Sequence, residues 1–194
     1  MIFRNWKKEI LTIPNLLSLF RLVLIPVYAT MYLNATEPYQ YVLAGLVLAI
    51  SCLTDLIDGK IARKFNMITN LGKVLDPLAD KLTQLTLTVC LSMKYPVLYP
   101  VLALFVVKEL FQLILGIVNL RKGKMLPGAL MAGKVCTTVL FISLIALVLF
   151  PQMNSNAVTV ISLVDTVFLA ISFVNYIHAY FGKNVKVQDI ESKG

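Results

Sequence analysis

Long apolar stretches separated by short polar segments run along the whole chain of 194 residues. A helix of about 20 apolar residues crosses the roughly 30 Å of hydrocarbon in a bilayer. The pattern predicts six transmembrane helices, at residues 14–33, 39–57, 75–93, 97–120, 129–150 and 157–181. We therefore expect an all-α, polytopic membrane protein with one integral-membrane domain over residues 1–194. Any active site must then be built from the helices and their short loops.

The first twelve residues have a different pattern. Residues 1–12 mix basic side chains, such as Lys7 and Lys8, with apolar ones, among them Trp6. This mixture is typical of a short amphipathic helix in the membrane interface, where tryptophan is enriched. We expect such a helix to end near Pro14, with an unstructured basic tail as the alternative. A secretory cleavage site is missing, and the lack of a targeting segment favours a bacterial inner (plasma) membrane.

The basic residues alternate between the two sides of the predicted bundle. The formal net charge is +8, although 58% of the residues are hydrophobic. Basic side chains gather at both ends of the chain and in alternate loops, within residues 4–8, 60–73, 121–124 and 183–193. The remaining loops carry only Glu37 and Lys94 as charged residues. This positive-inside pattern predicts both termini in the cytoplasm, and it explains the charge without a nucleic-acid partner.

Four of the ten acidic residues lie where the second predicted span ends and the third begins. Asp55 and Asp58 are three residues apart, and Asp76 and Asp80 are four apart, so each pair shares one helix face. The short connection at residues 64–71 lets the two helices be antiparallel neighbours. Carboxylates this close repel one another and are costly near lipid, so they need a neutralising partner. The alternative is a set of ordinary interfacial charges that cap helices and pair with nearby basic residues.

The residue types around these aspartates favour phosphate chemistry. Oxygen ligands without histidine or cysteine suit hard cations such as Mg²⁺, Mn²⁺ or Ca²⁺. Four carboxylates can hold two such ions, an arrangement that suits displacement at phosphorus. Gly59 and Gly72 allow close backbone approach, and Arg63 and Lys81 supply positive charge for phosphate oxygens. The sequence therefore predicts a two-metal site at the cytoplasmic membrane surface.

The complete pattern D-x2-D-G-x2-A-R-x8-G-x3-D-x3-D runs from Asp55 to Asp80. In residue types and spacing it resembles the signature of the CDP-alcohol phosphatidyltransferases. Residues 13–21, which end at Arg21, are similar to the N-terminal segment of that family, and the six-span layout also fits. The resemblance covers most of the chain and is weaker after residue 95.

The resemblance implies a specific reaction. A phosphatidyl group passes from CDP-diacylglycerol to an alcohol with release of CMP, and the family suggests a homodimer. Two divalent cations, Mg²⁺ or Mn²⁺, would be bound by Asp55, Asp58, Asp76 and Asp80. Asp80 would also be the general base that deprotonates the acceptor hydroxyl. The residues expected to line the CDP-lipid site are Thr54, Gly59, Ala62, Arg63, Gly72 and Lys73.

A second polar set is a candidate acceptor site. Lys108 and Glu109 lie in the middle of the fourth predicted span, and Asp165 lies in the sixth. Ionisable groups inside a membrane are candidate functional residues. The structural alternative is an ion pair of Lys108 with Asp165 or Glu109. The basic residues expected to bind the acceptor are Lys108, Arg121, Lys134 and Arg21.

The acceptor alcohol is open among three members of the family. Residues 13–17, 69–73 and 133–138 are most similar to enzymes that use glycerol-3-phosphate. Those enzymes usually carry arginine where this chain has Lys108, and a second arginine where it has residues 115–118. Cardiolipin synthases, which use phosphatidylglycerol, and enzymes that use an inositol phosphate are the alternatives.

Two other protein classes use clustered aspartates. Membrane prenyltransferases hold a Mg²⁺-diphosphate between aspartate-rich helices, but in a longer bundle with more spans. In a cation transporter or channel, the carboxylates would line a path through the middle of the membrane instead of clustering at one surface. Release of CMP that depends on the lipid donor distinguishes the transferase from both.

Overall fold

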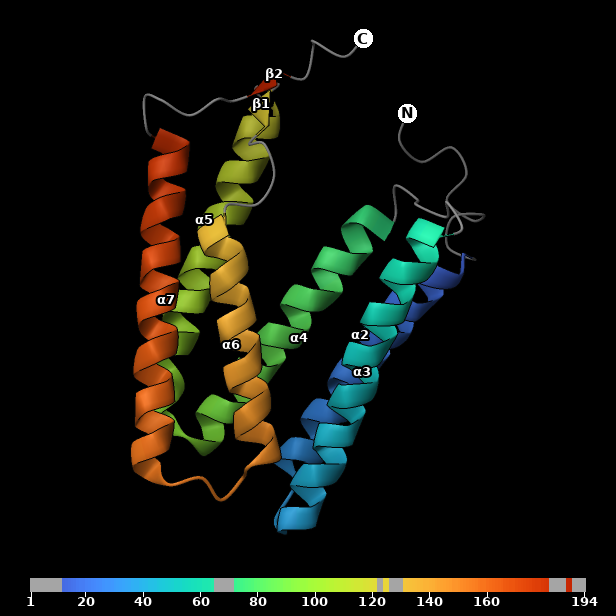
Figure 1. Ribbon diagram of the computed structural model, residues 1–194, viewed down its shortest axis with the longest axis vertical. Helices are drawn as coiled ribbons and strands as arrows, with labels where there is room; N and C mark the ends of the chain where they lie inside the picture. Colours follow the sequence, from blue (N-terminus) through green and yellow to red (C-terminus); the bar gives the residue numbers. More distant parts are fainter. Residues whose placement is uncertain (1–11, 65–71, 122–123, 126–130, 182–187, 190–194) are drawn as a thin grey trace. The chain divides into compact units, whose positions relative to one another are not determined.

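The computed structural model describes residues 12–64, 72–121, 124–125, 131–181 and 188–189. For residues 56, 58–64, 73–74, 120–121, 124–125, 181 and 188–189 it describes the backbone only. Long α-helices make up most of these ranges (Figure 1). They are α2 (Ile13–Leu33), α3 (Pro38–Lys64), α4 (Gly72–Lys94), α5 (Tyr99–Arg121), α6 (Met131–Leu149) and α7 (Ser155–Phe181).

The remaining described elements are short. A 3₁₀ turn, η1 (Pro96–Leu98), precedes α5, and strand β1 (Lys124–Met125) pairs antiparallel with β2 (Gln188–Asp189). The predicted all-α fold is thus confirmed, with one two-residue strand pair added. The predicted interfacial helix at residues 1–12 lies outside the described residues except for Thr12, which precedes α2.

Helices occupy all six places that the apolar pattern predicted. Among the described residues, four segments are long and apolar enough to cross a membrane, namely Ile13–Leu33, Pro96–Asn119, Met131–Leu149 and Ser155–Tyr180. The prediction of six spans is therefore confirmed only in part, because α3 and α4 are not among the four. In α4 the apolar run is interrupted by polar residues, and Thr83, Gln84 and Thr88 are buried. The sequence pattern alone did not reveal that these polar side chains face inward.

Apolar side chains cover much of the outer surface. Val23 on α2 and Leu163 on α7 are each 61% exposed, and many other leucines, isoleucines and valines are exposed as well. Soluble monomers rarely expose large contiguous apolar patches. Together with the four apolar segments, this surface indicates a membrane protein.

The chain divides into two compact units. The N-terminal unit consists of Met1–Leu91 and Leu147–Gln152, and it contains α2, α3 and most of α4. The C-terminal unit consists of Ser92–Ala146 and Met153–Gly194, and it contains α5, most of α6 and α7. The predicted single domain over residues 1–194 stays a prediction, and each unit is described separately below.

In the N-terminal unit, α2 and α3 lie side by side (Figure 1). Their shared end carries an aromatic cluster, in which the Tyr32 ring centroid is 5.6 Å from that of Tyr28 and 5.2 Å from that of Tyr41. The Tyr41 hydroxyl donates a hydrogen bond to the Ala35 carbonyl in the connection (2.9 Å). These contacts fix the helix pair at the end opposite to the aspartates.

In the C-terminal unit, α5 packs against α7. The Phe111 ring is edge-on to Phe173, with centroids 5.1 Å apart. Ser162 of α7 donates a hydrogen bond to the Val97 carbonyl of η1 (2.7 Å). Gly133 of α6 meets Tyr176 of α7 so closely that an added Cβ would lie 2.5 Å from the phenol oxygen. A larger residue at position 133 would therefore force α6 or Tyr176 to move.

Candidate active site

One arginine joins two of the predicted metal ligands. The Arg21 Nη1 atom of α2 lies 2.5 Å from Asp55 Oδ1 of α3 and 2.6 Å from Asp80 Oδ1 of α4. Bonds between a guanidinium and a carboxylate are charge-assisted and stronger than neutral hydrogen bonds. The structure therefore confirms that aspartates from the second and third predicted spans come together, and it identifies a cation between them.

A third aspartate contacts the same face of α2. The Ser18 hydroxyl is 2.5 Å from Asp76 Oδ1 and 3.0 Å from the Pro14 carbonyl. Because the hydroxyl has one proton and the carboxylate is both closer and charged, we assign the donated hydrogen bond to Asp76. Ser18 and Arg21 are three residues apart, one helical turn, and both are buried. A polar stripe on α2 thus contacts three of the four predicted ligands.

Burial divides this cluster into a fixed cation and accessible anions. Arg21 is 2% exposed, whereas the side chains of Asp55 and Asp80 are 41% and 51% exposed. The guanidinium is held inside the helix bundle of the N-terminal unit, and the two carboxylates remain open to a ligand. This is the arrangement that a site for an external substrate requires.

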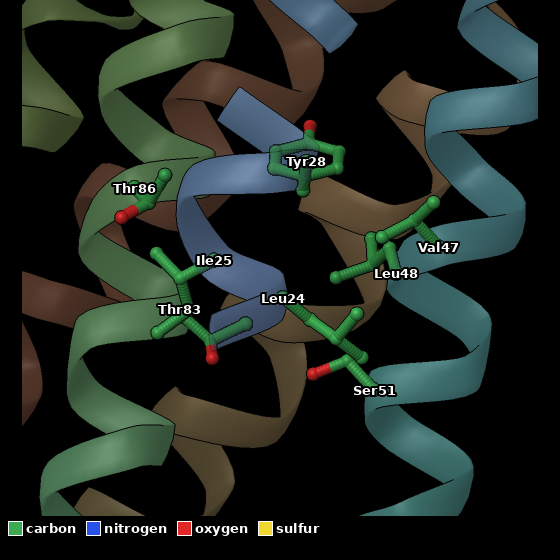
Figure 2. Close-up of a pocket in the computed structure, with 8 residues that line it drawn as sticks. All are labelled: Leu24, Ile25, Tyr28, Val47, Leu48, Ser51, Thr83 and Thr86. Atoms are coloured by element: carbon green, nitrogen blue, oxygen red, sulfur yellow. The ribbon is translucent and has the colours of Figure 1, made fainter. Parts of the chain in front are cut away.

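A small pocket lies about one helical turn deeper along all three helices. It is lined by residues one or two turns from Arg21, Asp55 and Asp80, and Figure 2 shows them projecting from α2, α3 and α4: Leu24, Ile25, Tyr28, Val47, Leu48, Ser51, Thr83 and Thr86. It has room for about one water molecule. A pocket of this size is too small for a substrate.

The donor set suits a hard divalent cation. Asp55 and Asp80 offer carboxylate oxygens that already converge on one positive charge, and Asp76 lies one turn from Asp80 on the same helix. Among the side chains that the structure describes, no three acidic, histidine or cysteine residues form a closed metal-binding group. The Asp58 side chain is outside the described set, so the predicted four-carboxylate site stays a prediction.

The predicted CDP-lipid residues lie beside these aspartates in the helices. Thr54 precedes Asp55, and its hydroxyl donates a hydrogen bond to the Ser51 carbonyl (2.7 Å). Gly72 is buried at the first position of α4, one turn before Asp76. The side chains predicted to line the rest of this site are outside the described set: Ala62, Arg63 and Lys73, with Gly59 described only as helix backbone.

In the C-terminal unit, Lys108 is buried and paired within its own helix. Its Nζ atom is 2.6 Å from Glu109 Oε1 and 3.2 Å from Gln112 Oε1. It also lies 5.8 Å from the centroid of the Tyr176 ring, in cation–π range. Of the two structural pairings considered from sequence, the structure contains the one with Glu109.

Asp165 of α7 is also buried, at 1% exposed. Within the described side chains it forms no ion pair with Lys108, so that proposed pairing is wrong. Both oxygens of this carboxylate are buried and have no hydrogen-bond partner in the part of the chain that the structure describes. Lys108 and Asp165 are both internal to the C-terminal unit and contribute to its helix packing.

The other predicted acceptor residues differ in exposure. Lys134 is exposed near the start of α6, and Arg121 ends α5 with its side chain outside the described set. Sequence reasoning missed Ser18 and Gln112 as partners of charged groups. Ser18 could have been predicted from the sequence, because a serine and an arginine one turn apart in an apolar span form a polar stripe. Gln112 could have been predicted in the same way, because it lies one turn after Lys108.

Comparison with known proteins agrees with the site. Residues 11–174 match the family model described as CDP-alcohol phosphatidyltransferase. The chain is 33% identical over 172 residues to a CDP-diacylglycerol–glycerol-3-phosphate 3-phosphatidyltransferase of Aquifex aeolicus, which covers 86% of this chain and 94% of the relative. It is 32% identical over 146 residues to a probable phosphatidylglycerophosphate synthase of Mycobacterium tuberculosis, covering 74% of this chain and 68% of the relative.

A relative with another acceptor is similar as well. The chain is 36% identical over 132 residues to a cardiolipin synthase (CMP-forming) of Streptomyces coelicolor, covering 66% of this chain and 61% of the relative. The family model spans most of the chain, and the Aquifex relative aligns along nearly all of both sequences. Three aspartates of the signature contact α2, and on these matches this chain belongs to the CDP-alcohol phosphatidyltransferase family.

Proposed function

We propose that this enzyme transfers the phosphatidyl group of CDP-diacylglycerol to glycerol-3-phosphate, which forms phosphatidylglycerophosphate and releases CMP. The observation that carries the proposal is the match to the Aquifex enzyme, whose name states this reaction and whose sequence is covered almost completely. The Mycobacterium relative supports the same acceptor. The convergence of Asp55 and Asp80 on one buried cation supplies the acidic centre that such chemistry needs.

The catalytic roles follow from the chemistry of the carboxylates. Asp55, Asp58, Asp76 and Asp80 would hold two divalent cations, Mg²⁺ or Mn²⁺, in keeping with the general metal dependence of the family. When bound, these ions would neutralise the diphosphate and the leaving CMP. Asp80, half-exposed at the rim of the cluster, would accept the proton of the acceptor hydroxyl. The acceptor oxygen bonds to the phosphorus that carries the diacylglycerol, and the bond to CMP breaks.

The acceptor phosphate would bind basic side chains near the same membrane surface. Lys134 is the most accessible of the predicted residues, because its side chain is exposed. Lys108 would bind the acceptor phosphate with the remaining N–H of its ammonium group, since Glu109 and Gln112 accept two of the three hydrogen bonds that this group can donate. Arg121 and Arg21 complete the proposed set of acceptor-binding residues.

The membrane arrangement is also part of the proposal. α3 and α4 would cross the bilayer beside the four apolar segments, giving six spans with both termini and the active site at the cytoplasmic face. The basic loops support this orientation. Bacterial relatives support a place in the bacterial inner membrane, and a homodimer is expected from the family.

The test is direct. Purified protein in detergent with Mg²⁺ or Mn²⁺ is given CDP-diacylglycerol and, in separate reactions, glycerol-3-phosphate, phosphatidylglycerol or an inositol phosphate. CMP release and the mass of the lipid product are measured. We expect phosphatidylglycerophosphate only. Cardiolipin as the product would assign the second candidate function, which the Streptomyces relative favours. No CMP with any acceptor would reject the transferase and favour a transporter or a prenyltransferase.

A further inference from the structure

The guanidinium of Arg21 occupies the kind of position that a bridging cation takes. It is buried at 2% exposed, and a single nitrogen contacts carboxylate oxygens from two different helices. A buried arginine is tolerated only when its charge is compensated, and here Asp55 and Asp80 compensate it. Conversely, the two carboxylates repel each other less because the arginine lies between them.

We propose that Arg21 is a built-in counter-cation of the carboxylate site, which holds Asp55 and Asp80 together before divalent ions bind and opposes their binding by charge. That Arg21 holds the two aspartates together rests on the contacts alone. That it opposes metal binding rests on the proposed function, in which these two aspartates are metal ligands. Arg21 is therefore a positioning residue that keeps the site assembled in the membrane.

The sign of the effect on metal affinity follows from linkage. The contacts of Arg21 with Asp55 and Asp80 relieve the repulsion between the two carboxylates, and this relief matters most when no divalent ion is bound. In the metal-loaded protein the same guanidinium lies beside ions of like charge, so it stabilises that state less. A group that stabilises the metal-free state more than the metal-bound state lowers metal affinity. Removing the charge should thus tighten metal binding and destabilise the metal-free protein.

Two other roles of Arg21 make different predictions. If the arginine mainly oriented the ligand carboxylates, its removal would weaken metal binding by about 10- to 100-fold, as outer-shell partners do. If it served packing alone, its removal would lower stability equally with and without metal. Removal of Arg21 should therefore tighten metal binding if Arg21 is a counter-cation, and weaken it if Arg21 orients the ligands. If Arg21 serves packing alone, the loss of stability should be the same with and without metal.

Ser18 provides a matched control. It lies one turn before Arg21 on the same buried face of α2, and it contacts Asp76 through a neutral hydroxyl. Ser18→Ala removes a contact to the same carboxylate cluster without changing its charge. Any tightening of metal binding that is specific to Arg21 must therefore come from the lost positive charge.

The experiment uses the full-length protein in detergent and Mn²⁺ as the probe. Mn²⁺ affinity is measured from the free-ion paramagnetic signal for the unchanged protein, Arg21→Met, Arg21→Lys and Ser18→Ala. Melting temperatures are recorded in chelator and in saturating Mn²⁺. We expect Arg21→Met to bind Mn²⁺ about 5-fold tighter or more, and to lose more melting temperature in chelator than in Mn²⁺. Ser18→Ala should show no gain in affinity.

Weaker or unchanged Mn²⁺ binding by Arg21→Met would overturn the proposal, as would equal losses of melting temperature in both conditions. If Arg21→Met does not fold, Arg21→Gln, measured in the same way, decides. It removes the charge but keeps hydrogen-bond donors, so its Mn²⁺ affinity should lie above that of the unchanged protein, and an equal or lower affinity overturns the proposal. Arg21→Lys keeps the charge and should bind Mn²⁺ about as well as the unchanged protein. The proposed function is judged separately by CMP release from the unchanged protein. If the unchanged protein releases CMP but Arg21→Met does not bind Mn²⁺ more tightly, only the inference about Arg21 is rejected. If the unchanged protein neither binds Mn²⁺ nor releases CMP, both the inference and the proposed function are rejected.

Discussion

Arg21 in the N-terminal unit and Lys108 in the C-terminal unit are both buried basic side chains, but they are neutralised in different ways. Arg21 contacts carboxylates from two other helices. Lys108 contacts Glu109 and the Gln112 amide oxygen on its own helix. The first arrangement exists only when three helices are assembled, whereas the second forms within a single turn.

The difference separates a site from a structural element. Contacts between distant segments make the geometry of Asp55 and Asp80 depend on the whole N-terminal unit, which is what a site needs if its ligands must be held in place. The ion pair Lys108–Glu109 makes a charge tolerable inside a membrane helix within one turn, and the contact of Lys108 with another helix is a cation–π contact with Tyr176 and not an ion pair. We therefore expect catalysis to depend most on the N-terminal cluster, and the variants below test that contrast.

The largest expected effect is the loss of catalysis in Asp80→Asn. The amide keeps the shape and one oxygen of the carboxylate but cannot accept a proton, so CMP release should fall by about 100-fold or more. Mn²⁺ and CDP-diacylglycerol binding should fall much less. The measurements are CMP release and the binding of each ligand.

Asp165→Asn is the matched control, because it makes the same change at a buried carboxylate of the C-terminal unit. It should retain CMP release within a few-fold. Equal losses of binding and turnover in Asp80→Asn would argue against its role as base. A comparable loss of turnover in Asp165→Asn would remove the contrast between the two units.

The next effect concerns packing in the C-terminal unit. In Gly133→Ala the new Cβ would lie 2.5 Å from the Tyr176 hydroxyl oxygen, so α6 or Tyr176 must move. Overpacking of this kind costs about 1–3 kcal/mol in the free energy of unfolding. Tyr176→Phe removes the nearest atom and should restore part of that loss, which melting temperatures of the single and double variants will show.

Gly116→Ala is the control for this change. Among the described atoms, its added Cβ meets the Tyr180 hydroxyl oxygen at 4.0 Å, an ordinary contact. Replacing glycine by alanine in a helix should then be neutral or stabilising by about 0.5–1 kcal/mol. If Gly133→Ala behaves in the same way, Tyr176 is not held by α6 as described.

A third variant asks whether the C-terminal unit contributes to substrate choice. Lys134→Gln removes an exposed charge proposed to bind the acceptor phosphate, so the KM for glycerol-3-phosphate should rise by about 10-fold, while the KM for CDP-diacylglycerol changes little. Lys94→Gln removes a lysine from the last turn of α4, at an end expected on the opposite side of the membrane. It should leave both values unchanged, and an equal rise in both variants would assign the effect to overall charge.

Much of this architecture could be predicted from sequence, because its causes are local in the chain. Apolar stretches of span length predicted helices at all six places, and the spacing of Asp55 and Asp80 within the signature predicted that their helices meet. The polar residues of α4 show where this reasoning fails. Thr83 and Gln84 lower the hydropathy of the helix, yet they are buried. Periodicity along one helix does not tell which neighbour its polar face meets.

The partners of the two buried cations show the same limit. Glu109 and Gln112 are within one turn of Lys108, so sequence spacing predicts that they can meet. Asp165 was an equally good partner by charge, and only the packing of α5, α6 and α7 excludes it. For Arg21, the sequence indicated a role in substrate binding but not the contacts with Asp55 and Asp80, because these depend on how three helices pack.

The smallest expected effects compare, in each cluster, one hydrogen bond between a neutral and a charged side chain. Ser18→Ala removes the interhelical contact to Asp76 and should cost about 1.5 kcal/mol in the free energy of unfolding, because its partner is charged and the contact is short, at 2.5 Å. Gln112→Ala removes a longer contact, 3.2 Å, to a lysine that keeps Glu109 as its partner, and it should cost about half as much. Chemical denaturation of both variants under the same conditions gives the two values. If Gln112→Ala lowers the free energy of unfolding more than Ser18→Ala does, local pairing stabilises Lys108 at least as strongly as interhelical contacts stabilise the aspartates. The distinction between the two clusters must then rest on catalysis alone.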